Sequence, residues 1–209
     1  MTKLQVAIDL LTTADALTLA NKVADHVDII ELGTPLIKSA GLGVISAVKA
    51  AHPDKQVLAD MKTADAGFLE ADLAFAAGAD LVTVLGTAGD PTVRGAVEAA
   101  EKHGKAVVAD LIGVPNRVER AQQVVKLGVA FVELHAGLDE QAQPGYSVQT
   151  LLDDGQIAGV PFAVAGGVNV TSIAAVRAAG AEVAVAGGAI YGADDPAGAA
   201  AELKAALTQ

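Results

Sequence analysis

The sequence predicts a single α/β domain, a (β/α)8 barrel of the TIM-barrel type, over residues 1–209. Short apolar runs rich in Val and Ile alternate with Ala-rich stretches that have helical spacing. The runs are almost continuously apolar, which is typical of parallel strands covered on both faces. Several stretches end at a glycine just before the next run, as at Gly78, Gly104, Gly128 and Gly180. Eight such units in one chain favour a barrel.

Taken in chain order, each apolar run predicts a strand. A doubly wound open sheet is the main alternative, but it usually has fewer strands and a glycine-rich turn after the first one. Here Asp9-Leu10-Leu11-Thr12-Thr13 stands at that turn, and no Pro/Ser-rich linker marks a domain boundary. Helices are expected between strands, among them Ala14–Val23, Phe68–Ala76, Thr92–Glu101, Val118–Val125 and Ile173–Ala178. The expected strands are Leu4–Leu10, Val27–Leu32, Gln56–Met61, Leu81–Leu85, Ala106–Ile112, Ala130–Leu134, Pro161–Ala165 and Glu182–Ala186.

Composition excludes several classes of function. The net charge is −11 and no Lys/Arg run or basic-aromatic patch is present, so we expect neither a nucleic-acid nor a membrane partner. Cysteine is absent, which excludes disulfides, thiolate metal sites and cysteine nucleophiles. No apolar run approaches the length of a membrane span and no signal peptide precedes the first strand. We therefore expect a soluble, cytoplasmic protein.

Ionisable residues stand at the carboxyl ends of five of the first six predicted strands, on runs that otherwise carry almost no charge. Barrel enzymes build their active sites at this end of the barrel. One such residue alone would be read as a solvated charge, but five in the same position predict a site. In chain order they are Asp9, Glu31, Asp60 with Lys62, Asp110 and His135.

The third strand ends in the pattern Asp60-x-Lys62-x-x-Asp65. Asp60 and Lys62 are two residues apart, so on an extended strand their side chains point to the same side. Asp65 falls where the next helix is expected to begin, on the same rim. Taken alone, the pattern also fits a structural ion pair that closes the strand. The repetition of charged strand ends along the chain favours a functional site.

Paired glycines follow the last two predicted strands, at Gly166-Gly167 and Gly187-Gly188. Two glycines in a row allow the backbone to approach a ligand closely and to direct N–H groups at an anion. Each pair alone also fits ordinary turn chemistry. The loops after the seventh and eighth strands are, however, where this fold binds phosphate, so we predict a phosphate site there.

The crowding of carboxylates at one barrel mouth predicts a divalent cation. Asp9, Glu31, Asp60 and Asp110 cannot all remain ionised side by side without compensation, and Lys62 offsets only one of them. Mg²⁺ suits carboxylate ligands and accepts substrate oxygens, and Mn²⁺ is the alternative ion. At a strand end, only the imidazole of His135 has an ordinary pKa near neutrality, so it is the candidate for proton transfer. Together, phosphate, metal and a proton shuttle suggest enolisation of a sugar phosphate.

With these residues in view, the chain resembles the orotidine 5′-monophosphate decarboxylase suprafamily, whose mark is the pattern at Asp60, Lys62 and Asp65. Within it, the chain most resembles the family of 3-hexulose-6-phosphate synthases, and the resemblance runs nearly from end to end. The other supporting segments are Gln5–Asp9, Glu31–Pro35, Ala109–Ile112, His135–Asp139, Val164–Val168 and Val185–Ile190.

The resemblance implies an aldol reaction in which formaldehyde and D-ribulose 5-phosphate give D-arabino-3-hexulose 6-phosphate, with Mg²⁺ as cofactor. By similarity, Glu31 and Asp60 are metal ligands. Lys62 and Asp110 then lie about an enediolate intermediate, and His135 moves the proton at C1 of the sugar.

The resemblance also implies a homodimer with shared active sites, because Asp65 in relatives reaches into the neighbouring subunit's site. By the same similarity, Asp9 holds a substrate hydroxyl or orients Lys62, and Thr34 is a substrate-binding residue. The glycines Gly166, Gly167, Gly187 and Gly188 are expected to bind the phosphate.

Two alternatives stay open at this point. The sister enzyme 3-keto-L-gulonate 6-phosphate decarboxylase shares the fold, but it carries arginines where this chain has Leu138 and Gly188. The loss of both cations disfavours decarboxylation and leaves backbone N–H groups to meet the phosphate. A non-catalytic barrel that binds a phosphate ligand is the third hypothesis, and the complete set of acids, lysine and histidine counts against it.

Overall fold

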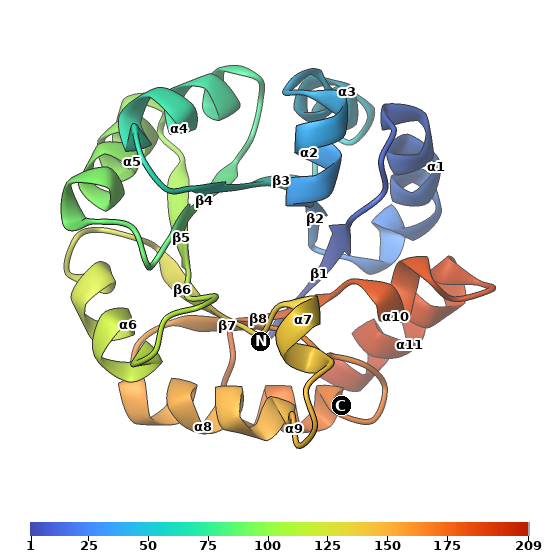
Figure 1. Cartoon of the computed structure of the whole chain (residues 1–209). Helices are drawn as coiled ribbons and strands as arrows, with labels where there is room; N and C mark the ends of the chain where they lie inside the picture. Colours follow the sequence, from blue (N-terminus) through green and yellow to red (C-terminus); the bar gives the residue numbers. More distant parts are fainter. Residues whose placement is uncertain (209) are drawn as a thin grey trace.

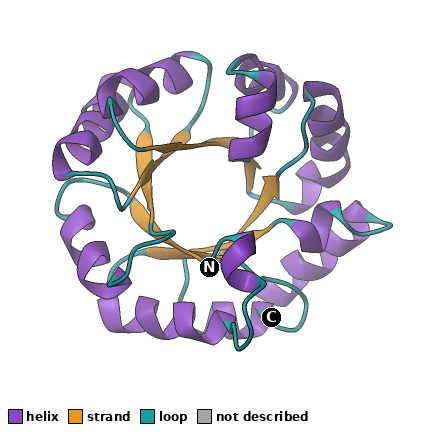
Figure 2. Cartoon of the chain, viewed as in Figure 1, coloured by secondary structure: helices purple, strands orange, loops and turns teal. Residues whose placement is uncertain are grey.

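The computed structural model describes residues 1–208, so Gln209, the last residue of the predicted domain, lies outside the described part. Eight parallel strands form a closed barrel in which each strand pairs with the next along the chain and β8 pairs with β1. Figures 1 and 2 show the strands as an inner ring and the helices as an outer one. The predicted single-domain (β/α)8 barrel is confirmed. The strands are β1 Lys3–Ile8, β2 Ile29–Leu32, β3 Gln56–Thr63, β4 Leu81–Leu85, β5 Ala106–Asp110, β6 Phe131–His135, β7 Phe162–Ala165 and β8 Val183–Ala186.

Every predicted strand is present, with ends that differ by three residues or fewer, and the five helices named from the sequence are α1, α4, α5, α6 and α9. The helices left unnamed are either at most seven residues long or contain a glycine, which weakens their periodicity. The full set is α1 Thr13–Val23, η1 Ala24–His26, α2 Thr34–Ala40, α3 Gly43–Ala51, α4 Gly67–Ala76, α5 Asp90–His103, α6 Arg117–Val125, α7 Leu138–Gln141, α8 Val148–Ala158, α9 Ile173–Ala178, α10 Gly188–Tyr191 and α11 Pro196–Thr208. None of the helices described here is long and apolar enough to cross a lipid bilayer.

Alternate residues of each strand point into the barrel or out toward the helices, so the molecule has two apolar cores. The outer core is built largely from Ala, Val, Leu and Ile, as the scarcity of aromatic residues requires. The inner core consists of Ile29, Leu58, Leu81, Val108, Phe131, Ala163, Ala165, Val183 and Val185.

Above the inner core, the inward positions change from apolar to polar. A buried layer there contains Gln5, Glu31, Asp60, Thr83, Asp110 and Glu133, each at most 5% exposed. Four buried carboxyl groups in one layer are costly unless hydrogen bonds or cations compensate them. The arrangement of these groups therefore defines the candidate site.

Candidate active site

The end of β3 brings Asp60 and Lys62 into contact, as their spacing predicted. The ammonium nitrogen of Lys62 lies 3.2 Å from Oδ1 and 3.0 Å from Oδ2 of Asp60. The strand is irregular here: its pairing with β4 shifts register between Ala59 and Thr63, and Lys62 has a φ of 45°. A left-handed lysine is strained, and such strain is found mainly where surrounding contacts enforce it.

Thr83 on β4 supplies the contacts that hold this irregular strand end. The N–H of Lys62 donates to Thr83 Oγ1 at 2.9 Å, and that hydroxyl donates to Asp60 Oδ1 at 2.7 Å. Thr34, at the start of α2, places its Oγ1 2.8 Å from both the carbonyl oxygen and Oδ2 of Asp60. Asp60 is thus fixed from three sides, and Thr34 contacts it directly, whereas a contact of Thr34 with substrate stays a prediction.

Lys62 also links β3 to β5, because its ammonium group forms an ion pair with Asp110 Oδ2. Burial opposes a charged amine, but the carboxylates of Asp60, Asp110 and Glu133 outweigh it and raise the pKa of Lys62 above 10.5. Lys62 therefore remains a cation at neutral pH. It can stabilise negative charge on a ligand, but it is poorly suited to act as a base.

His135, at the end of β6, meets the other side of Asp110. Its Nδ1 lies 3.0 Å from Oδ2 and 3.2 Å from Oδ1 of Asp110. Burial favours a protonated Asp110, yet His135 and then Lys62 lower the pKa of this carboxyl to about 2. Burial likewise disfavours the imidazolium, but Asp110 outweighs it and raises the pKa of His135 above 6.5. With Nδ1 turned to Asp110, Nε2 is the nitrogen left for a substrate.

The structure adds one acid that sequence reasoning missed, Glu133. The residue is 2% exposed, its Oε1 lies 3.3 Å from His135 Nδ1, and its Oε2 has no hydrogen-bond partner within residues 1–208. Burial, followed by the negative charges of Asp110 and Glu31, raises the pKa of Glu133 well above 4.5. The signal was present in the sequence: Glu133 stands two residues from both Phe131 and His135, which is the inward-facing period of β6.

Glu31 and Asp9 complete the acidic side of the mouth. Glu31 is 5% exposed and accepts a 2.7 Å hydrogen bond from Gln5 Nε2. Burial and the charge of Asp60 raise the pKa of Glu31 well above 4.5. Burial and Asp60 also raise the pKa of Asp9. A β-carbon added at Gly33 would lie only 2.0 Å from Oδ1 of Asp9. The ends of β1 and β2 are therefore in close contact.

Two groups of side chains present ligand atoms for a cation, and both include the carboxylate oxygens that Mg²⁺ prefers. Asp110, Glu133 and His135 each present a ligand atom within 4.8 Å of the others, but the ammonium of Lys62 already contacts Asp110. Glu31 makes no ion pair within the described residues, although Asp60 is close enough to raise its pKa. This uncompensated, buried carboxyl beside a second carboxylate fits a hard divalent ion. Glu31 and Asp60 therefore remain the predicted metal ligands.

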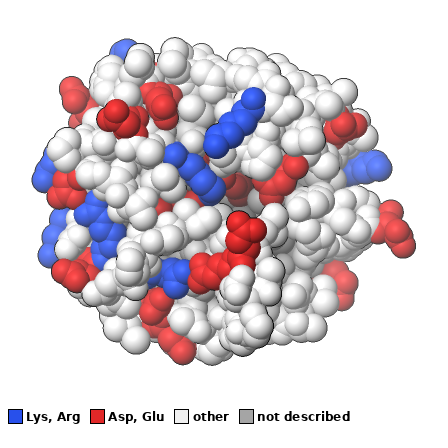
Figure 3. All heavy atoms as spheres, viewed as in Figure 1, with Lys and Arg blue, Asp and Glu red and all other residues white. Residues whose placement is uncertain are grey.

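The remaining predicted site residues fall into two groups. Gly166 and Gly167 follow β7, while Gly187 and Gly188 lead into α10, so both pairs stand at the same barrel end as the charged groups. Asp65, in contrast, is exposed, and its Oδ1 accepts a hydrogen bond from the N–H of Ala66 at 2.7 Å. Within one described chain, Asp65 forms no hydrogen bond or ion pair with the other predicted site residues. Figure 3 shows charged side chains of both signs around a hollow in the middle of this face.

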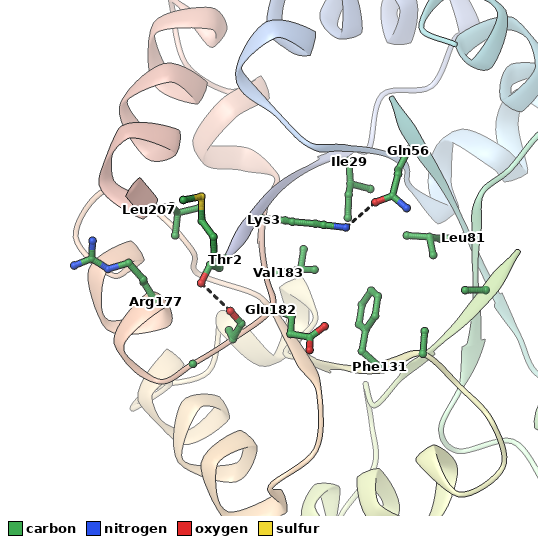
Figure 4. A pocket seen from close by; sticks show the side chains of 15 residues that line it. Thr2, Lys3, Ile29, Gln56, Leu81, Phe131, Arg177, Glu182, Val183 and Leu207 are labelled. Atoms are coloured by element: carbon green, nitrogen blue, oxygen red, sulfur yellow. Dashed lines mark hydrogen bonds between the residues drawn. The ribbon is translucent and has the colours of Figure 1, made fainter. Parts of the chain in front are cut away.

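A cavity of about 690 Å³ lies at the opposite end of the barrel (Figure 4). Lys3 extends across it and donates to Gln56 Oε1 at 2.9 Å, above a floor that includes Phe131. This is the amino-terminal end of the strands, which in this fold contributes to stability. The charged layer, and not this cavity, is therefore the candidate active site.

A closed barrel that gathers titratable side chains at the carboxyl ends of its strands is the architecture of (β/α)8 enzymes. Residues 2–203 match the model of the orotidine 5′-phosphate decarboxylase / HUMPS family, and the chain belongs to this family.

Within the family, the chain is similar to a 3-hexulose-6-phosphate synthase of Mycobacterium gastri, with 68% identity over 205 residues that cover 98% of this chain and 99% of the relative. A crystal structure of a 3-hexulose-6-phosphate synthase has the same fold, with a TM-score of 0.98, 68% identity, and coverage of 99% of this chain and 100% of that one.

The alternative enzyme is represented by a more distant neighbour. The structure of 3-keto-L-gulonate-6-phosphate decarboxylase from Vibrio cholerae superimposes with a TM-score of 0.87 at 28% identity, covering 99% of this chain and 97% of that one. The two enzymes therefore share the barrel, while the sequence is much closer to the synthase. This agrees with Leu138 and Gly188 standing at the two positions expected to be arginine in the decarboxylase.

Proposed function

We propose that this chain is an aldehyde-lyase that condenses formaldehyde with D-ribulose 5-phosphate to give D-arabino-3-hexulose 6-phosphate. The observation that carries the proposal is the continuous contact from Asp60 through Lys62 and Asp110 to His135. It combines a permanent cation, a low-pKa carboxylate and a titratable imidazole at one barrel mouth. The similarity to named synthases over nearly the whole chain supports the same reaction.

His135 is the proposed base. Its Nε2 takes a proton from C1 of ribulose 5-phosphate, and the electron pair of that C–H bond forms the 1,2-enediolate. C1 then attacks the carbon of formaldehyde, and the aldehyde oxygen receives the proton held by the imidazolium. Asp110 holds His135 through Nδ1 at 3.0 Å throughout, and Lys62 offers its ammonium to the charge that develops on the substrate oxygen.

Glu31 and Asp60 are proposed to hold a divalent cation, Mg²⁺ or Mn²⁺. The uncompensated burial of Glu31 beside Asp60 supports this assignment. When bound, such an ion supplies positive charge at the substrate oxygens where negative charge develops. Lys62 is already in contact with Asp60 and Asp110, so the ion and the ammonium would serve different oxygens of the same site.

We also propose a cytoplasmic homodimer in which Asp65 of one chain completes the site of the other. Asp65 is exposed and forms no hydrogen bond or ion pair with the other site residues of its own chain, which supports a role across an interface. The helix that follows it, α4, leaves apolar side chains in solvent: Phe68 is 37% exposed, Leu69 59% and Leu73 50%. Three large apolar side chains on one helix beside a site residue are typical of an interface.

One assay tests the reaction. The enzyme is incubated with ribulose 5-phosphate in D₂O, with and without formaldehyde, and with Mg²⁺ or chelator. We expect hexulose phosphate only with formaldehyde, and deuterium at C1 even without it. His135→Asn should lose the deuterium exchange and the synthesis by similar factors of about 10²–10⁴. Decarboxylation of 3-keto-L-gulonate 6-phosphate without synthesis would favour the sister enzyme, and binding without turnover would favour a non-catalytic barrel.

A further inference from the structure

The loop after β7 has both of its glycine carbonyl groups bound by side chains. The hydroxyl of Tyr146 donates to the carbonyl oxygen of Gly166 at 2.8 Å. The carbonyl oxygen of Gly167 accepts from Ser172 Oγ at 3.0 Å and from Asn169 Nδ2 at 3.2 Å. These oxygens would repel an anion if they faced it, so their direction decides what the loop can bind.

Holding a carbonyl group also fixes the direction of the next N–H group. All described peptide bonds are trans, so the C=O of one residue and the N–H of the next point to opposite sides of the peptide plane. The contact with Tyr146 thereby directs the N–H of Gly167 away from Tyr146, and the bonds to Gly167 do the same for the N–H of Val168. Among the described residues, no group accepts a hydrogen bond from the N–H of Gly166, Gly167 or Val168.

Only glycine fits this loop conformation. The φ angles of Gly166 and Gly167 are 105° and 76°, and a β-carbon at Gly166 would lie 2.5 Å from the carbonyl oxygen of Ala136. Three successive N–H groups of this loop thus have no acceptor among the described residues and are available to an anion. The loop is therefore set in this state before any ligand arrives.

Tyr146 is itself well anchored. It lies between α7 and α8, and its N–H donates to the carbonyl of Gln143 at 3.2 Å. Arg117 on α6 holds α7 through both carboxylate oxygens of Glu140, at 2.8 and 3.0 Å. Burial raises the pKa of the Tyr146 hydroxyl, so it remains a hydrogen-bond donor at neutral pH.

We infer that Tyr146 is a positioning residue for the phosphate group of the substrate, acting through the Gly166 carbonyl to hold the Gly167 N–H toward the anion. The inference deepens the proposed function. It depends on that function only for the identity of the sugar phosphate. It assigns a role to a side chain that does not touch the substrate. It also explains how phosphate is held without the two arginines expected in the decarboxylase. A pre-formed backbone site, fixed by the hydrogen bond from Tyr146, takes their place.

The test compares Tyr146→Phe with the wild type, because this change removes one oxygen and keeps the ring. Calorimetry measures binding of three probes: ribulose 5-phosphate, ribulose and inorganic phosphate. Steady-state kinetics measures kcat and both KM values. We expect affinity for the two phosphate probes to fall about fivefold, with KM for ribulose 5-phosphate rising similarly, and little change in kcat or in KM for formaldehyde. Ribulose should bind the two proteins equally.

Ser147→Ala is the matched control, because it also removes a hydroxyl from this segment but one that caps α8 through the N–H of Gln149. It should lower thermal stability and leave phosphate affinity unchanged. Unchanged phosphate affinity in a folded Tyr146→Phe protein would overturn the inference, as would an equal loss for ribulose. If the wild type binds phosphate but makes no hexulose phosphate, the proposed function fails while the role of Tyr146 can still be measured.

Discussion

Asp110 is the residue on which the charges of the site converge. It is fully buried, yet it contacts the ammonium of Lys62 and the Nδ1 of His135 at the same time. A buried carboxylate with two cationic partners is stabilised in its ionised form, which is why its pKa falls to about 2 despite burial. In return, Asp110 raises the pKa of His135 and sets which ring nitrogen faces the substrate.

The pH dependence of the reaction follows from this pair. A base must be neutral to accept a proton, and Asp110 raises the pKa of His135 above 6.5. At saturating Mg²⁺, kcat/KM should therefore rise with pH to a plateau whose midpoint lies above 6.5. The Asp110→Asn variant lacks the main cause of the raised pKa of His135, so the midpoint should shift to lower pH. The plateau should fall at least about tenfold. A mutant with an unchanged midpoint would show that another group is the base.

Glu133 carries a stability cost that a single substitution can reveal. Its raised pKa means that the folded protein holds a proton that the unfolded chain releases, so stability falls as pH rises from 4.5 toward the folded-state value. Glu133→Gln removes this loss. We expect no gain near pH 4 and a gain on the order of 1 kcal/mol in the free energy of unfolding at neutral pH. Urea unfolding across this pH range measures it, and a gain independent of pH would contradict the titration of Glu133.

At the scale of elements, β3 and α4 form the unit on which the site and the proposed interface meet. The irregular end of β3 positions Asp60 and Lys62 inside the barrel, and Asp65 then lies exposed in the short loop to α4. The apolar side chains of α4 follow within one to three turns. The segment from the end of β3 into α4 thus connects the barrel interior to a surface that a second chain can cover.

Mixing two inactive variants tests the shared site. Asp65→Ala and Lys62→Ala dimers should each be inactive, but subunit exchange creates hybrids in which one site has both groups intact. Random exchange of equal amounts should restore about a quarter of the wild-type activity. Adding Leu73→Glu to both variants should prevent recovery, because a charge on the α4 surface disrupts its burial. Adding Ile157→Glu should not prevent recovery, because Ile157 is 68% exposed and lies on α8, away from the proposed interface.

No recovery despite exchange shown by labelled subunits would rule out sharing. Recovery that survives Leu73→Glu would place the interface on a surface other than α4.

At the scale of the whole molecule, the barrel is organised around an excess of acid. The chain carries −11, and the buried layer contains four carboxyl groups against the single lysine Lys62. Apolar residues fill the barrel below this layer, so the acids cannot move away from the mouth. A divalent ion at Glu31 and Asp60 would relieve the repulsion and stabilise the fold as well as the reaction.

Mg²⁺ should therefore raise the midpoint of thermal unfolding. At about 100 times its Kd, the expected stabilisation of roughly 2.7 kcal/mol corresponds to an increase of roughly 5–10 °C. Glu31→Gln should lose this increase and, without Mg²⁺, melt higher than the wild type, because a buried acid is neutralised. Glu133→Gln, the matched control, should keep the full effect of Mg²⁺. An undiminished effect in Glu31→Gln would exclude Glu31 as a ligand.

The residue pattern was enough to predict the barrel, because eight apolar runs each need to be covered on both faces and glycines mark most of the helix ends between them. It also determined that Asp60, Lys62, Asp110 and His135 gather at one mouth, since parallel strands end at the same edge. Which of these groups touch became visible only in the folded barrel. Contacts between strands depend on register and side-chain rotamers, neither of which leaves a periodic signal. For the same reason the bond from Tyr146 to Gly166, made across twenty residues, could not be foreseen. Glu133 did leave a signal, the two-residue period of β6, but it was missed because it stands before the strand end.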